Sequence, residues 1–325
     1  MGVLLALISA FSFASSYVLI RAGVRPSDPD NGLMITMLVN VAMLTVGAIL
    51  LPFFLPQPPI TLPAIGWFVG AGLFGPLIGR NALFASIRLI GSTRGAALKN
   101  NAPIVVVILA ITFLDERFTP QAMLGIGLVI GGLLMLAYEA FTKGPPGEAR
   151  RSDPIVTEGL IADGPSGEVA ATTWTQRLAG PTIAGISTGL LAAVAFGVSQ
   201  TCRALGIDAM PNAVLGSAIG VWVGLLSYAA VVASQGRLTS MLRFNLRHAR
   251  PLLWLAGVAT TSGNIAFYMA VTIAPISYVS VVSASETIIT LLLGALVLRR
   301  VESISSQIVL PAFAIFGGTA LIALG

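Results

Sequence analysis

Residues 276–298 read ISYVSVVSASETIITLLLGALVL, a run of 23 residues whose single charged side chain is Glu286. The hydrocarbon core of a bilayer is about 30 Å thick, and an α-helix of roughly 20 apolar residues can cross it. A helix suits this environment because it satisfies its own backbone polar groups, for which lipid offers no hydrogen bonds. The run is therefore predicted to be a transmembrane helix with Glu286 near its middle.

Nine other stretches have a similar length and apolar character. Of all residues, 56% are hydrophobic and 10% are charged, against about 25% charged in soluble proteins. The sequence thus predicts an all-α polytopic membrane protein with ten transmembrane helices, and it excludes soluble, collagen-like and disordered classes. The ten predicted spans lie near residues 3–21, 32–53, 64–86, 97–114, 120–140, 181–203, 212–233, 251–271, 276–298 and 305–324.

An offset of 183 residues superposes the first half of the chain on the second. Each half holds five predicted helices, an odd number, so the halves would cross the membrane in opposite senses, as in many secondary transporters. We expect two five-helix repeats, residues 1–141 and 181–325, joined by a polar, proline-rich linker at 142–180. The coinciding pairs include Phe13 with Phe196, Ser16 with Ser199, Gly23 with Gly206, Asn81 with Asn264, and Phe84 with Phe267.

The net charge is +5, and 15 of the 18 Lys and Arg residues lie in the odd-numbered loops as predicted from the spans. Short loops rich in Lys and Arg stay in the cytoplasm. This rule predicts an inner-membrane protein with a cytoplasmic linker and both termini outside. Since the basic residues follow the loops, they indicate the membrane surface and not a nucleic-acid partner.

The sequence gives no sign of a cofactor, a metal or an enzyme. Cys202 and His248 are the only residues of their kinds, too few for a metal cluster. Gly70, Gly72 and Gly75 spell GxGxxG, but they lie inside an apolar helix, where such spacing is typical of close helix packing. No recognisable nucleophile–base pair or nucleotide-binding loop is present.

Polar residues inside the predicted spans are the candidate site. Glu286 stands in a hydroxyl-rich run with Ser280, Ser283, Ser285 and Thr287. An ionisable group at this depth costs about 2.5–3.5 kcal/mol on insertion scales, so it is functional by default. We expect Glu286 to bind substrate or carry a proton, with Ser283 beside it. The alternative is a structural ion pair with an intramembrane arginine.

Further candidate site residues are Arg80 and Asn81 in the third span and Asn264 and Tyr268 in the eighth. If these faces converge, an arginine fork could hold a carboxylate or phosphate while the amides and the phenol orient the substrate. Alternatively, Arg80 neutralises Glu286, and the two asparagines form hydrogen bonds between helices.

Other polar positions have more local interpretations. Ser16 in the first span and Gln200 in the sixth are expected to line a central path, although many serines only bond to their own helix. Lys99 is interpreted as an anchor that reaches the water interface. Thr119 is predicted to cap the helix that Pro120 begins.

Two segments carry a family resemblance. Residues 84–132, FASIRLIGSTRGAALKNNAPIVVVILAITFLDERFTPQAMLGIGLVIGG, and residues 267–307, FYMAVTIAPISYVSVVSASETIITLLLGALVLRRVESISSQ, resemble the drug/metabolite transporter superfamily, specifically proteins with two EamA-type domains. The sequence departs from the family pattern at Thr287, where the second repeat commonly has proline, and at Arg299 and Arg300, which replace an acidic turn.

This resemblance implies a permease that exports an amino acid or a related polar or amphipathic metabolite across the cell membrane, as a monomer or homodimer. Alternating access at mid-membrane, coupled to protons through Glu286, is the mechanism we expect. A lipid flippase and a structural membrane subunit of the same fold are the alternatives.

Overall fold

The structure is a computed structural model that describes residues 1–24, 30, 32–54, 56–90, 92–142, 181–248, 250–298 and 306–324. The predicted linker and the basic turn at Arg299 and Arg300 lie outside these residues. The helices in the first half are α1 (Gly2–Gly23), α2 (Leu33–Leu50), the 3₁₀-helix η1 (Leu51–Phe53), α3 (Leu62–Gly72), the π-helix η2 (Leu73–Gly79), α4 (Arg80–Ile90), α5 (Ser92–Lys99), α6 (Ala102–Phe113) and α7 (Pro120–Thr142).

The second half continues the all-helical pattern. Its helices are α10 (Pro181–Ala209), α11 (Ala213–Ser234), α12 (Leu238–His248), α13 (Pro251–Val271), α14 (Ile276–Ser283), α15 (Glu286–Leu298) and α16 (Ser306–Leu324). Helices therefore form at all ten predicted stretches.

Eight of these stretches, within the described part of the chain, are long and apolar enough to cross a membrane. The other two are α13, which has 21 residues but carries Thr260, Thr261, Ser262 and Asn264, and α16, whose apolar part is 310–324. The molecule is thus a polytopic membrane protein.

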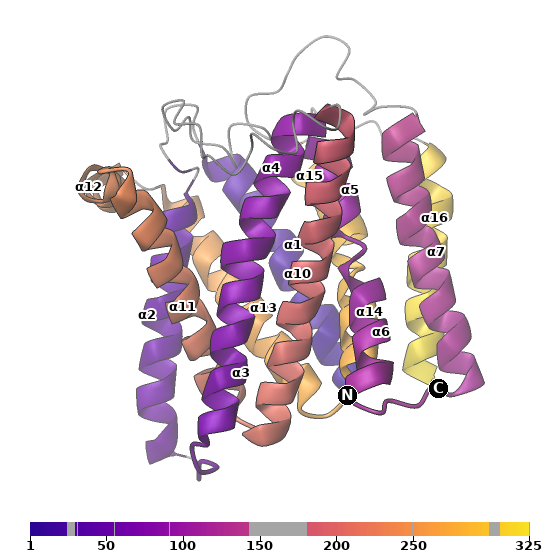
Figure 1. Cartoon of the computed structure of the whole chain (residues 1–325), viewed down its shortest axis with the longest axis horizontal. Coiled ribbons are helices and arrows are strands. Elements are labelled where there is room, and N and C mark those ends of the chain that lie inside the picture. The colour runs from indigo at the N-terminus through magenta and orange to yellow at the C-terminus, as the bar shows by residue number, and fades with distance from the viewer. Residues whose placement is uncertain are drawn as a thin grey trace.

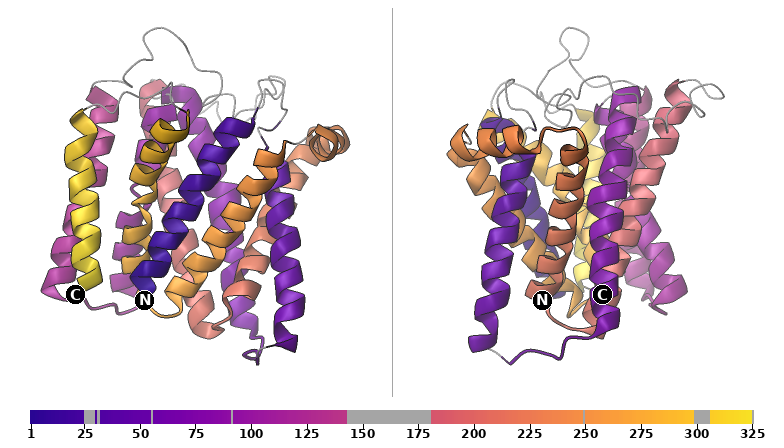
Figure 2. Two further views of the ribbon diagram at one scale, coloured as in Figure 1. Left: turned by 180° about the vertical axis from the view of Figure 1, so that it is seen from behind. Right: turned by 60° about the vertical axis from the view of Figure 1, so that its left-hand side comes forward.

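The long helices stand side by side, and both termini lie at the same end of the bundle (Figure 1). Each half contributes helices that pack against the other half. α1 lies along α13, α14 and α15, whereas α10 lies along α3, α4, α5 and α6. α7 and α16 pair at one edge of the bundle (Figures 1 and 2).

Helix α12 was not among the predicted elements, because its 11 residues are too few and too polar to span lipid. It lies across the end of the bundle opposite the termini and is seen almost end-on in the left view of Figure 2. Met241 on its buried face packs with Met34 and Val232. The amide of Asn245 donates to Asp30 Oδ1 at 3.1 Å, and Asp30 also accepts from the backbone N–H of Met34 at the start of α2.

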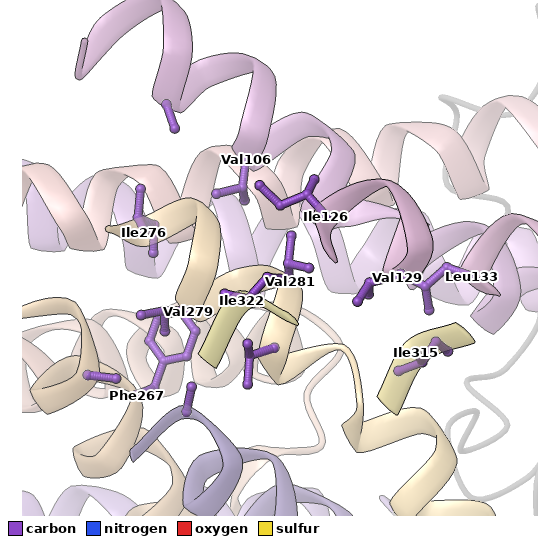
Figure 3. Close-up of a cluster of buried hydrophobic side chains, with 14 of the residues drawn as sticks. Val106, Ile126, Val129, Leu133, Phe267, Ile276, Val279, Val281, Ile315 and Ile322 are labelled. Carbon is purple, nitrogen blue, oxygen red and sulfur yellow. The ribbon is translucent and has the colours of Figure 1, made fainter. Parts of the chain in front are cut away.

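The main apolar core lies in the half of the bundle nearer the termini. It gathers between α1, α6, α7, α14 and α16, where Val106, Val129, Val281 and Ile315 are fully buried (Figure 3).

Small residues allow the helices to approach closely. A Cβ added at Gly72 would lie 2.7 Å from Val223 Cβ, and one at Gly75 would lie 2.7 Å from Ser199 Oγ. Both distances are shorter than van der Waals contact, so only glycine fits there. The GxGxxG motif is therefore a packing surface, as its position in an apolar span predicted.

The turn after α6 ties the two halves together. Asp115 adopts a left-handed conformation with φ 50°, and Glu116 reaches the start of α14 in the other half. Its carboxylate accepts hydrogen bonds from the backbone N–H of Ile276 at 2.8 Å and from the N–H and hydroxyl of Ser277. On the other side of the turn, Thr119 Oγ1 accepts from the N–H of Ala122 at 3.2 Å, which confirms the predicted cap of α7.

Substituting Glu116→Ala should lower the free energy of unfolding by about 2 kcal/mol, because hydrogen bonds to a charged group contribute about 1.5–3 kcal/mol. Thermal unfolding in detergent measures the change as a lower midpoint. Arg117→Ala, at an exposed neighbouring position, is the control and should stay within about 0.5 kcal/mol of the unsubstituted protein. Equal midpoints for the two variants would show that the cap contributes nothing.

Candidate functional site

Two transmembrane helices are interrupted midway, and the interruptions occupy equivalent positions in the two halves. The fourth span breaks between Lys99 at the end of α5 and Ala102 at the start of α6. The ninth breaks between Ser283 at the end of α14 and Glu286 at the start of α15. The 183-residue offset carries Lys99 to Val282 and Ala102 to Ser285, so the two breaks lie one residue apart in the repeat register.

Local chemistry explains the first break better than the second. Pro103, the second residue of α6, lacks a backbone N–H and disfavours helical geometry in the residue before it. The second break contains no proline or glycine. Its chain tightens into i to i−3 hydrogen bonds, from Ser285 N to Val282 O at 3.1 Å and from Thr287 N to Ala284 O at 3.2 Å.

One hydrogen bond joins the two breaks directly. The side-chain amide of Asn100 donates to Thr287 Oγ1 at 3.1 Å. Interrupted helices within a membrane are tolerated where they are buried in protein or line a polar space, and in transporters they mark the binding site. The meeting point of the two breaks is therefore the candidate site.

Opposite charges flank the meeting point. Lys99 ends α5 and Glu286 begins α15, and the Lys99 charge acts on the Glu286 carboxyl. Each charge also suits its own helix, because a cation is stabilised at a helix C-terminus and an anion at an N-terminus. The Lys99 ammonium lies 5.2 Å from the centre of the Phe196 ring. Lys99 is thus close to the polar centre, and its interpretation as an anchor at the water interface stays a prediction.

Tyr17 stands between Glu286 and Arg80. Its side chain is hydrogen-bonded to that of Glu286, and the Arg80 charge acts on the Tyr17 hydroxyl. The ring keeps 43% of its surface exposed, so this group is reachable from outside the packed interior. Glu286 is therefore approached by Lys99 and Tyr17, with Arg80 beyond the phenol.

Several polar atoms around this centre are buried without a hydrogen-bond partner. They include Nη1 of Arg80, Oε1 of Gln200, and the hydroxyl oxygens of Ser280, Ser283 and Ser285. Leaving such an atom unsatisfied costs about 1–3 kcal/mol. A small polar molecule bound here could supply the missing partners.

Two predicted residues make structural hydrogen bonds. Ser16 Oγ donates to Ala256 O at 2.9 Å and lies 2.6 Å from Thr260 Oγ1, which ties α1 to α13. Asn81 is exposed, and its amide donates to Leu77 O of the same chain segment at 2.6 Å. Neither side chain joins the group around Glu286.

Asn264 and Tyr268 lie at a different depth from Glu286. Ser9 bonds Gly263 O while Ser16 bonds Ala256 O, so α1 and α13 run antiparallel. Tyr268 is then about 13 residues from the level of Tyr17, or about 20 Å toward the termini at 1.5 Å per residue. Tyr268 is 2% exposed and packs with Phe68, Ile207 and Met210.

Among the described residues, no group of three or more His, Cys, Asp or Glu could hold a metal ion. The polar centre has one carboxylate, Glu286, and two basic side chains, Lys99 and Arg80. This set suits an organic molecule that carries both hydrogen-bond donors or cations and acceptors or anions.

Comparison with known proteins agrees with this geometry. Residues 1–138 match the EamA-like transporter family. This match covers 138 of the 325 residues, so the first half of the chain is similar to that family, in agreement with the resemblance that the sequence carries. No curated protein sequence matches it.

The fold of this chain is shared over nearly its whole length with a solved structure. One described as "Crystal structure of protein" superposes with a TM-score of 0.63 at 16% sequence identity, covering 99% of this chain and 97% of that chain. At this identity the likeness concerns the fold alone.

If Lys99 stabilises the ionised Glu286, Lys99→Met and Glu286→Gln should not act additively. We expect the double variant to be more stable than the sum of the single losses predicts, by about 0.5–3 kcal/mol, because each single change leaves one charge without its partner. The four proteins of this cycle are compared by thermal unfolding in detergent. Strict additivity would mean that the two charges do not interact.

Proposed function

We propose that the chain is a secondary transporter that moves a small polar or amphipathic metabolite across the cytoplasmic membrane by alternating access. The observation that carries this proposal is the meeting of two broken helices at equivalent positions, with Lys99, Glu286 and unpartnered polar atoms around them. Binding sites of many transporters lie at such paired interruptions near mid-membrane.

Contacts between the halves support two inverted repeats. α1 lies along α13 to α15, and α10 lies along α3 to α6, which is the exchange that the offset requires. Ser16 and its counterpart Ser199 make the same kind of bond, since Ser199 Oγ donates to Ala71 O at 2.7 Å. Phe13 packs against Gly263, and Phe196 packs against Gly79. We therefore retain residues 1–141 and 181–325 as the two repeats.

The distribution of apolar packing suggests how access would alternate. The clusters around Val281 and around Phe68 lie between the polar centre and the end of the bundle that holds the termini. In our proposal this packing closes one end of the path. The helices that form the packing separate when the transporter changes state. Asn264 and Tyr268 would meet the cargo only after that opening.

Within this scheme each polar residue has a role. Glu286 is the proton site, and Arg80, Gln200 and Ser283 contact the cargo, because their buried polar atoms lack partners. Ser16 and Asn81 act through packing. The family resemblance favours export of an amino acid or a related metabolite, and the charge distribution favours a cytoplasmic linker with both termini outside.

Proton coupling through Glu286 can be tested in proteoliposomes loaded with a pH-sensitive dye. Adding amino acids, nucleosides, sugars or polyamines one at a time should reveal a compound that moves protons in the unsubstituted protein. Glu286→Gln should abolish that proton movement, because an amide cannot take up and release a proton. Asp208→Asn, which alters an exposed carboxylate near the end of α10, is the matched control.

Proton movement that survives in Glu286→Gln would contradict the assigned role. Movement of labelled lipid between leaflets, with no response to any soluble compound, would favour the flippase alternative. A reconstituted protein that moves neither would favour a structural subunit.

A further inference from the structure

A second arginine within the membrane belongs to none of the roles above. Arg203 lies on α10 inside its apolar span, Ile183–Ala209. Its guanidinium carbon lies 5.5 Å from the centre of the Phe267 ring and 5.5 Å from that of Tyr268. Its Nε is buried and has no hydrogen-bond partner. A charged fork thus lies beside two neighbouring aromatic rings, with part of its donor capacity unused.

Two side chains near Arg203 are uncharged at neutral pH. The Arg203 charge acts on Cys202 and Tyr268, and neither side chain type is ionised at neutral pH. In the part of the chain that the structure describes, no carboxylate lies within ion-pair distance of Arg203. An intramembrane arginine usually pairs with another charge or marks a ligand path.

Arg203 and Arg80 mark two levels of the same path. The Cys202 sulfur lies 3.5 Å from the position of a Cβ at Gly70, so Arg203 is level with α3. Arg80 comes ten residues after Gly70 in the same span, Leu62–Leu83, which corresponds to about 15 Å. Arg203 therefore lies nearer the termini than the polar centre, beside the apolar cluster that includes Phe68 and Tyr268.

The repeat register gives Arg203 no counterpart. The 183-residue offset pairs it with Ile20, and it pairs Arg80 with Gly263. Each arginine is thus present on one side of the pseudosymmetric path only. A symmetric packing role would not require such a difference between the halves.

We propose that Arg203 is a second anion-binding point, which takes the carboxylate or phosphate of a cargo molecule whose apolar part rests on the Phe267 and Tyr268 rings. The planar guanidinium can donate two parallel hydrogen bonds to such a group, and aromatic faces suit an apolar body. The inference rests on the proposed transport function and narrows its cargo to molecules that carry an anionic group.

Binding can be measured with simple probes that share one apolar body. Hexanoate carries a carboxylate, hexanamide is neutral and hexylammonium is cationic, so differences among them report on charge alone. Because Arg80 could also hold a carboxylate, the measurements use Arg80→Gln, which keeps Arg203. Saturable stabilisation by hexanoate against thermal unfolding in detergent, with no effect of the other two probes, is the expected result.

In this background Arg203→Gln should weaken hexanoate binding at least tenfold. Arg203→Lys should give an intermediate affinity, because the charge stays and the fork is lost. Arg203→Lys also keeps the cation within the membrane, so it reports on the fork even if Arg203→Gln does not fold. Arg117→Gln, at the exposed turn after α6, controls for a general loss of positive charge and should bind as the background does.

Absence of saturable hexanoate binding while Arg203 is intact would overturn the proposal, as would equal affinity in Arg203→Gln. These results are separable from the proposed function. Glu286→Gln should still bind hexanoate through Arg203 although it moves no protons. Proton-coupled transport of an uncharged compound, without hexanoate binding, would contradict the anion site at Arg203 and still support the proposed transport function.

Discussion

Lipid cannot satisfy a free backbone N–H or C=O group, and the rest of this structure depends on that constraint. Uninterrupted helices meet it by themselves. The fourth and ninth spans each break for about two residues, where the backbone tightens into i to i−3 hydrogen bonds such as Asn101 N to Leu98 O and Ser285 N to Val282 O. The two breaks face each other, where the Asn100 amide bonds Thr287 and the helix ends are complemented by Lys99 and Glu286.

The remaining helices hold these two breaks together and leave polar groups around them. Glycines at positions such as Gly72 and Gly75 bring the third span against α10 and α11, and Glu116 fixes the start of α14 from the other half. Apolar side chains such as Val106, Val281 and Ile315 pack in a buried cluster (Figure 3). The polar centre therefore lies beside a closed end, which is an arrangement that an alternating-access mechanism would use.

Much of this architecture could be predicted from the sequence. Hydropathy located the helices, the GxGxxG motif was recognised as packing, and the cap at Thr119 followed from its spacing to Pro120. The break at Ala284 and Ser285 could not be predicted, since it has neither proline nor glycine. Lys99 was assigned to the interface because a basic residue at the end of an apolar run is usually there.

In the structure, only some of the predicted site residues lie close to Glu286. Periodicity tells which residues share a helix face, but it does not tell which residues of antiparallel neighbours share a depth. Asn264 and Tyr268 were grouped with Glu286 for this reason, whereas the bonds of Ser9 and Ser16 to α13 place Tyr268 about 20 Å away. Tyr17, one residue from Ser16, points instead toward Glu286.

The most direct test of the central claim is thermal unfolding of the purified protein against a panel of amino acids, nucleosides, sugars, polyamines and lipids, with Glu286→Gln measured in parallel. A small metabolite at about 100 times its dissociation constant should stabilise the protein by about 2.7 kcal/mol. The account predicts a selective metabolite whose effect is lost in Glu286→Gln. Stabilisation by lipids alone, unchanged in that variant, would contradict a metabolite site at the meeting point of the broken helices.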